Sequence, residues 1–198
     1  MLELAQEKCV PRTGYALFPT YPLSKGDVGT GYLELAREFT RFSVMRIDGY
    51  VGVDWQTLRI GLHAAFEELR VEVNWIDVAE GWRSPPEISS LVEPYLGGDD
   101  PLFGTKYQGT LSDFLDTQAW AALKDVSATA MTVYYGCGAG LIDVQGAVAY
   151  VDLPKDELLR RSQQRQARNL GTNQTWSAKE QYKRFYFVDW PALNRHKA

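Results

Sequence analysis

The 198-residue sequence has little of the chemistry that metal and nucleophile sites need. It contains two histidines and two cysteines, and Cys9 and Cys137 stand far apart with no CxxC spacing. A zinc site needs about three or four ligands in a defined geometry, and no HxH, HxxxH or His/Cys cluster is present. No GxSxG motif marks a serine nucleophile. We therefore expect no metal centre, no zinc and no disulfide scaffold.

Long apolar runs and an excess of positive charge are also missing. No stretch approaches the length that spans a membrane, and the first residues include acids where a signal peptide would be basic. The formal net charge of −4 argues against nucleic acid and anionic membranes as partners. With 45% hydrophobic residues, the composition is that of a globular protein. We expect a cytoplasmic protein with one compact domain.

Alternating strand and helix patterns predict an α/β fold with a mainly parallel, five-stranded sheet. Residues 1–29 are rich in proline and glycine and are interpreted as an irregular N-terminal arm packed on the body, whereas residues 30–198 form a single domain. Strands are expected to end at Asp48 and Gly49 and to span residues 71–78, 131–135, 147–153 and 184–190. Helices are expected over residues 54–70 and 85–95, after a cap at Ser112, and from Pro154 to a stop near Gly171.

The stretch 43–55 combines a strand, a glycine-bearing turn and the start of a helix. Backbone N–H groups at a helix N-terminus can hold a phosphate, which makes Gly49, Tyr50, Gly52 and Asp54 candidate binding residues. The phosphate-loop pattern GxxxxGK[ST] is not met, because Val53 stands at the lysine position and Asp54 at the Ser/Thr position. Asp54 is also a good N-cap whose carboxylate would occupy the same N–H groups. A structural turn and an anion site therefore stand as alternatives.

Four arginines fall on the helix predicted after Pro154, and there is no carboxylate between residues 158 and 178. Arg161, Arg165 and Arg168 have the spacing i, i+4, i+7, which would form one stripe. Like charges at this spacing destabilise a helix, so a bound anion would explain the stripe, and arginine suits phosphate well. A solvated face, or one paired with distant acids, is the alternative.

Asp48 and Asp77 end two predicted strands, where parallel sheets place their sites. We therefore take both as candidate catalytic bases. The glycine-rich stretch 136–140 after a third strand would form a second nest of N–H groups or a point of close backbone packing.

Several phrases together resemble a known family. They are Ile47-Asp48-Gly49-Tyr50, the glycine-aspartate stretch 97–104, the segment Tyr150-Val151-Asp152-Leu153-Pro154 before the arginines, and the aromatic stretch 182–191. The chain resembles a uridine-kinase-like P-loop domain over residues 14–197, and in particular the N-terminal module of some large bacterial class I mannose-6-phosphate isomerases. That resemblance implies a three-layer P-loop NTPase-like fold in which Arg161 and Arg165 are lid groups for phosphate.

The resemblance further implies a degenerate kinase-like domain that binds a nucleotide or a sugar phosphate. The expected cofactor is ATP or another nucleotide with Mg, and the expected partners are a small phosphorylated ligand and a cupin-type isomerase domain or a second copy of the chain. Isomerase chemistry needs zinc ligands that this sequence lacks. One alternative is an active ATP-dependent phosphotransferase with Asp48 or Asp77 as base. Another is a non-catalytic interaction module that docks through aromatic residues, namely Trp176, Tyr182, Phe185 and Trp190.

Overall fold

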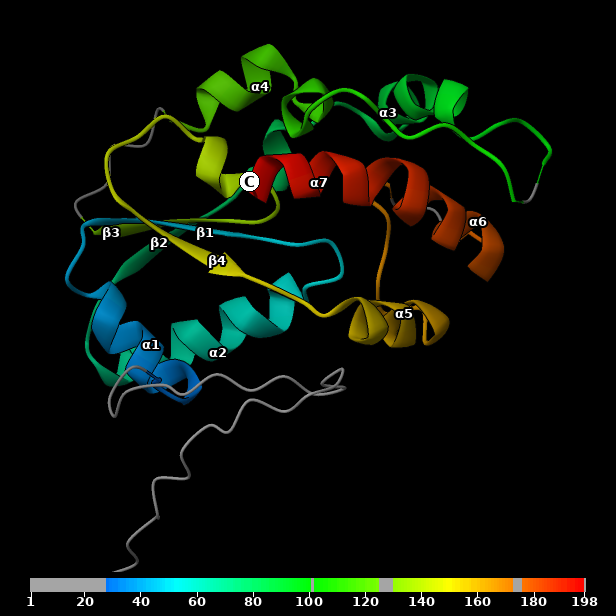
Figure 1. Cartoon of the computed structure of the whole chain (residues 1–198). Coiled ribbons are helices and arrows are strands. Elements are labelled where there is room, and N and C mark those ends of the chain that lie inside the picture. Colours follow the sequence, from blue (N-terminus) through cyan, green and yellow to red (C-terminus); the bar gives the residue numbers. More distant parts are fainter. Residues whose placement is uncertain (1–27, 101, 125–129, 173–175, 198) are drawn as a thin grey trace, which may run out of the picture.

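A parallel β-sheet forms the centre of the molecule (Figure 1). The computed structural model describes residues 28–100, 102–124, 130–172 and 176–197. Within them the sheet has four strands in the order β2-β3-β1-β4, and every neighbouring pair is parallel. The strands are β1 (Val44–Gly49), β2 (Val73–Asp77), β3 (Met131–Tyr135) and β4 (Ala147–Val151).

The central position of β1 follows from its pairing on both sides. Ile47 lies beside Tyr135 of β3 and beside Ala149 of β4. Burial on both faces requires apolar side chains in both directions, and β3, with four buried residues in a row, meets this requirement.

Seven α-helices accompany the described strands: α1 (Gly31–Phe39), α2 (Trp55–Glu68), α3 (Pro85–Val92), α4 (Thr117–Ala122), α5 (Lys155–Gln163), α6 (Ala178–Arg184) and α7 (Trp190–Lys197).

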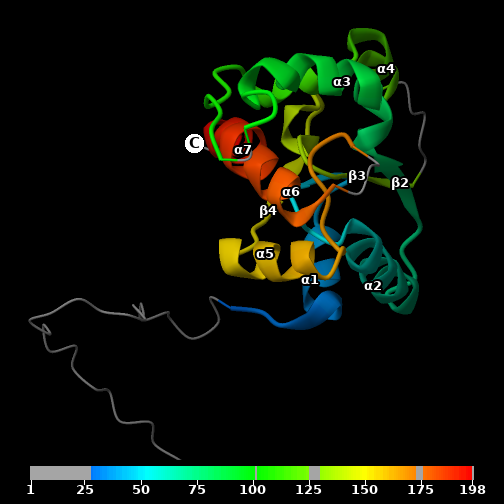
Figure 2. The same ribbon diagram turned by 90° about the vertical axis from the view of Figure 1, so that its right-hand side faces the viewer.

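Helices lie on both faces of the sheet. Figure 2 shows α1 and α2 below it and α3 and α4 above it. Phe39 of α1 and Leu62 and Phe66 of α2 pack against Met45 and other apolar residues of β1 and β3 in one core cluster. The opposite face carries a second cluster that includes residues of β2, β3 and the turn after β3. The protein is therefore an α/β domain with a buried parallel sheet, as the sequence predicts.

Local capping signals account for several helix starts. Asp54 caps α2, since its carboxylate accepts a hydrogen bond from the N–H of Thr57 at 3.0 Å. Ser84 and Glu87 form a capping box before α3, which has proline in its first turn. The helix expected after Ser112 is instead a 3₁₀ turn, Leu111–Phe114, followed by α4 with Asp116 as its cap.

The N-terminal arm predicted for residues 1–29 lies outside the described residues except at its last two positions.

The predicted fifth strand over residues 184–190 is wrong. This stretch continues α6 through a π-helical turn, Phe185–Asp189, into α7. Pro191 has no N–H for a bond to the carbonyl of Phe187, and the backbone N–H of Tyr107 donates to that carbonyl instead, at 2.7 Å. The helix is therefore maintained through a proline because a distant segment satisfies the free carbonyl.

The predicted arginine helix is also shorter than expected. α5 ends at Gln163 rather than near Gly171, and Arg165 has a φ of 58°, in the left-handed region. Its N–H donates to the carbonyl of Ser162, and the N–H of Gln166 donates to that of Arg161. These two bonds make a Schellman motif, which ends a helix. The stripe of Arg161, Arg165 and Arg168 on one helix therefore does not exist.

Candidate functional site

A cavity of about 570 Å³ lies at the carboxyl edge of the sheet. The helix after β1 packs on one face of the sheet, whereas the turn after β3 belongs to the cluster on the opposite face, so the chain leaves these two neighbouring strands toward opposite faces. Open parallel α/β sheets place ligands at such a switch point. The wall of the cavity is formed by residues within 51–55, 77–85, 136–137 and 166–172.

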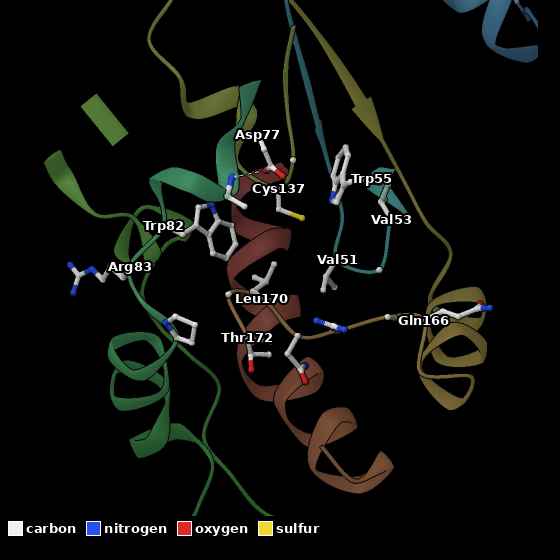
Figure 3. A pocket seen from close by; sticks show the side chains of 18 of the residues that line it. Val51, Val53, Trp55, Asp77, Trp82, Arg83, Cys137, Gln166, Leu170 and Thr172 are labelled. Atoms are coloured by element: carbon white, nitrogen blue, oxygen red, sulfur yellow. Dashed lines mark hydrogen bonds between the residues drawn. The ribbon is translucent and has the colours of Figure 1, made fainter. Parts of the chain in front are cut away.

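Two tryptophans stand on opposite sides of this cavity, with the sulfur of Cys137 between them (Figure 3). Trp55 opens α2, and Trp82 follows the 3₁₀ turn Val78–Gly81. Both indoles are half-buried, so each offers an aromatic surface to a ligand. Burial raises the pKa of the Cys137 thiol, which keeps the sulfur protonated and a weak nucleophile.

Three charged residues line the cavity, Asp77, Arg83 and Arg168, and the side chain of Arg83 points away from it (Figure 3). Nε of Arg83 donates to the carbonyl of Leu115 at 3.2 Å. The guanidinium of Arg168 makes no hydrogen bond or ion pair within the described part of the chain, and it is exposed. The one lining acid is Asp77, whose Oδ1 accepts a hydrogen bond from the N–H of Ala79 at 2.9 Å. The unpaired guanidinium of Arg168 is the feature of this wall that favours an anionic ligand.

The glycine-rich turn after β3 does form a nest of N–H groups, and its anion is Asp48. The N–H groups of Gly138 and Gly140 donate to the Asp48 carboxylate at 2.8 and 2.9 Å, and Gly49 donates at 2.7 Å. Nε2 of His196 in α7 lies 2.6 Å from Oδ2 of the same carboxylate. A Cβ at Gly140 would lie 2.6 Å from this oxygen, so glycine is needed there. Asp48, 2% exposed, is therefore a structural anchor.

The loop between β1 and α2 is likewise filled by the chain itself. Asp54 occupies the N–H of Thr57 and also accepts from its hydroxyl at 2.8 Å. These bonds lower the pKa of Asp54, so the carboxylate stays charged and would repel a phosphate at this helix end. Gly52 has a φ of 90°, and a Cβ there would collide with Leu158 of α5. This loop is a packed structural turn with its N-terminal donors already engaged.

The two predicted lid arginines lie in different places. Arg161 is held by Glu157 at 2.7 Å and donates to the carbonyl of Gly52 at 3.0 Å. Side-chain hydrogen bonds from Arg160 and Arg161 lower the pKa of Glu157 to about 2. Arg165 lines a second, smaller pocket and not the cavity. The structure therefore does not bring Arg161 and Arg165 together over the loop.

A buried polar network fixes the wall formed by residues 166–172. Asp189, fully buried, accepts from Nδ2 of Asn169 at 2.7 Å and from the N–H of Leu170 at 3.3 Å. Arg184 donates to the carbonyl of Leu170 at 2.7 Å, and its Nε lies 3.7 Å from Oδ1 of Asp189. Because this wall has no helical or strand hydrogen bonds of its own, its position depends on its contacts with α6 and with the π-helical turn.

Sequence reasoning placed the site at the edge of the sheet where the cavity lies, but it named few of the lining residues. Gly52 and Asp77 line the cavity, whereas Asp48, Gly49, Tyr50, Asp54, Arg161 and Arg165 do not. Tyr50 is buried and donates to Asn194 of α7 at 2.9 Å. The residues that sequence reasoning missed include Trp82, Arg83 and Ser84. The position of this segment just after the strand that ends at Asp77 was a usable signal.

Two negative observations apply to the described part of the chain. No group of three or more His, Cys, Asp or Glu side chains is arranged to hold a metal ion there. None of its helices has both the length and the apolar character needed to cross a bilayer.

The fold and the cavity define a parallel α/β domain with a ligand-sized site at its switch point. Residues 31–198 match the family model described as "Domain of unknown function (DUF8485)", and the chain belongs to this family. Comparison with curated proteins and comparison with solved structures find no match.

Proposed function

We propose that this domain binds a small phosphorylated ligand, a nucleotide or a sugar phosphate, in the cavity at the carboxyl edge of the sheet. The observation that carries the proposal is the wall of this cavity, which combines two tryptophans with the unpaired Arg168. Its volume of about 570 Å³ falls within the usual range for small-molecule sites, roughly 300–1,000 Å³.

The two kinds of lining residue match the two parts of such a ligand. Trp55 and Trp82 offer aromatic faces for a nucleobase or for the apolar face of a sugar. Arg168 offers a guanidinium group, which binds phosphate oxygens through charge-assisted hydrogen bonds. Asp77 is the one carboxylate in the wall, so Mg would arrive with a nucleotide rather than be held by the protein.

We further propose that the domain is a degenerate relative of P-loop kinases. The glycine turn between β1 and α2, the helices on both faces and the site at the carboxyl edge support this interpretation. The same turn carries its own carboxylate, Asp54, at the helix end where a kinase would hold phosphate. An active phosphotransferase would need Asp77 as its base, because Asp48 is already saturated with hydrogen bonds.

Calorimetry with ATP, GTP and mannose 6-phosphate, each with and without Mg, tests the proposal. We expect saturable binding of at least one of these ligands and no product by phosphorus NMR. Ala79→Phe would place a bulky ring in the cavity from an exposed position and should abolish binding. Arg168→Ala should weaken binding roughly tenfold or more, since charge-assisted hydrogen bonds contribute about 1.5–3 kcal/mol.

Arg37→Ala is the matched control, because Arg37 is an exposed arginine on α1 whose side chain has no partner among the described residues. It should leave affinity unchanged. Absence of binding for every ligand, or equal affinities for the Arg168 and Arg37 variants, would refute the proposal. Formation of a phosphorylated product would favour the phosphotransferase instead.

A second candidate function, an interaction module, is favoured by one apolar surface. Leu102 and Phe103 are 73% and 71% exposed, and Tyr182 and Tyr186 of the neighbouring helical segment are 45% and 41% exposed. Of the predicted docking aromatics, Phe185 and Trp190 are buried and unsuited to the role. We propose this surface as the contact for a cupin-type isomerase domain or a second copy of the chain. Size-exclusion chromatography with light scattering, alone and with such a domain, tests it.

A further inference from the structure

A second pocket, of about 210 Å³, lies behind the wall segment of the cavity. Its lining residues come from within 162–168, at and after the end of α5, and from within 176–181, at the start of α6. The two hollows share Ala167 and Arg168, and the remaining lining residues of the smaller pocket are its own. Its volume is below the usual range for nucleotide-sized ligands, roughly 300–1,000 Å³.

The charged side chains that line this smaller pocket are Arg165 and Arg168. Neither guanidinium has an acidic partner or a hydrogen bond within the described residues. The carboxylate of Glu180, which follows the lining residues Ser177 and Ala178 in the chain, is engaged in the capping box with the N–H of Ser177 at 2.9 Å. The pocket therefore concentrates positive charge that no described group neutralises.

Two further features point the same way. The indole N–H of Trp176 is buried without an acceptor among the described residues, and Trp176 lines the pocket. The floor is rigid, because Gln181 is hydrogen-bonded to both Ser162 and the carbonyl of Ala167. We infer that this pocket binds an oxyanion of the phosphate class between Arg165 and Arg168. The anion is either free phosphate or the phosphate end of a ligand whose other end occupies the cavity.

The backbone at Arg165 provides an unusual test. Arg165 occupies the left-handed position of a Schellman motif, where glycine is the favoured residue. Arg165→Gly therefore removes the guanidinium without disturbing the helix end. Arg70, at the end of α2, has the same conformation with a φ of 55° and the same pair of hydrogen bonds, but it lines neither pocket. Arg70→Gly is thus a control matched in charge, chemistry and backbone.

The full chain is titrated with inorganic phosphate. Calorimetry measures the affinity, and NMR of the arginine side-chain Nε–H groups shows which arginines are affected. We expect saturable binding, a shift of the Arg165 signal, and a loss of affinity of roughly tenfold or more in Arg165→Gly and in Arg168→Ala. Arg70→Gly should bind as the wild type does, and neither glycine variant should have a lower midpoint of thermal unfolding. No saturable binding by the wild type, or equal affinity in the two glycine variants, would overturn the inference.

A competition arm identifies the source of the anion and separates this inference from the proposed function. If phosphate displaces ATP or mannose 6-phosphate, the pocket holds the phosphate end of that ligand. If both bind at once, the pocket is an independent site for free phosphate. Ala79→Phe should remove binding in the cavity and leave the phosphate titration intact. If no ligand binds in the cavity, the proposed function is refuted. The inference about the smaller pocket is then still tested by the phosphate titration.

Discussion

Replacing Asp48 by asparagine should lower the free energy of unfolding by about 2.5–6 kcal/mol. The asparagine oxygen can still accept from Gly49 and Gly138, which both donate to Oδ1. The new NH₂ group takes the place of Oδ2, which accepts from Gly140 at 2.9 Å and lies 2.6 Å from Nε2 of His196. The charge-assisted hydrogen bond between Oδ2 and His196, about 1.5–3 kcal/mol, is lost. The N–H of Gly140 then faces a donor, at a cost of about 1–3 kcal/mol.

Urea-induced unfolding, followed by tryptophan fluorescence and circular dichroism, measures this change. The control is Asp143→Asn, because the Asp143 carboxylate is 94% exposed and lies 3.5 Å from Lys124. A surface pair of this kind contributes about 0–1 kcal/mol. If Asp48→Asn and Asp143→Asn cost the same, the anchoring role of Asp48 is refuted. The catalytic interpretation of Asp48 predicts a different outcome, in which stability is kept and phosphoryl transfer is lost.

Two further predictions concern the helical segments around the cavity. Burial raises the pKa of Asp189 to about 6, so the folded chain holds this proton more tightly than the unfolded chain does. Stability should therefore fall as the pH rises from about 4 to 6, by up to about 3 kcal/mol, and Asp189→Asn should remove this part of the pH dependence in urea unfolding. An unchanged slope would contradict the assignment. Gly52→Ala should lower the midpoint of thermal unfolding by more than Gly31→Ala does. Both glycines have a positive φ, but only at Gly52 would the new Cβ collide with Leu158. Equal effects would show that the contact with Leu158 carries no cost.

The elements that sequence reasoning located well carry strong local signals. β3 has the expected bounds because five apolar or β-prone residues end at a glycine-rich turn. α2 begins where Asp54 predicts a cap, and α3 begins at its two prolines. In each case the determinants lie within a few residues of the boundary, so no tertiary information is needed.

The predicted fifth strand failed because tertiary packing outweighed β-propensity. The aromatic and β-branched residues in 185–190 favour a strand on intrinsic preference. Burial, however, follows a helical spacing through Gln181, Phe185, Val188 and Ala192. The capping box that starts at Ser177 was the available local signal for this helix. The π-helical turn has no comparable sequence signal, because it depends on the N–H of Tyr107 reaching the carbonyl of Phe187.

The site was predicted less well than the sheet because its residues converge from distant segments. The end of β2 was identified through Asp77, but no local pattern shows that residues 166–172 cross to face it. That crossing is set by the buried contacts of Asn169 and Leu170 with Asp189, about twenty residues later in the chain. The arginine stripe failed for a related reason, since Arg165 forms a helix stop that arginine does not usually favour.

The chain itself occupies both of the anion-binding devices that its sequence suggests. The helix end after β1 is capped by Asp54, and the glycine nest after β3 encloses Asp48. A phosphate at either place would have to displace a carboxylate that already has two or more donors, and it would meet that negative charge at close range. Positive charge for a ligand must therefore come from the opposite wall, where Arg168 stands. Because Asp189 and Arg184 position that wall, binding in the cavity should depend on a buried ion pair that does not line it.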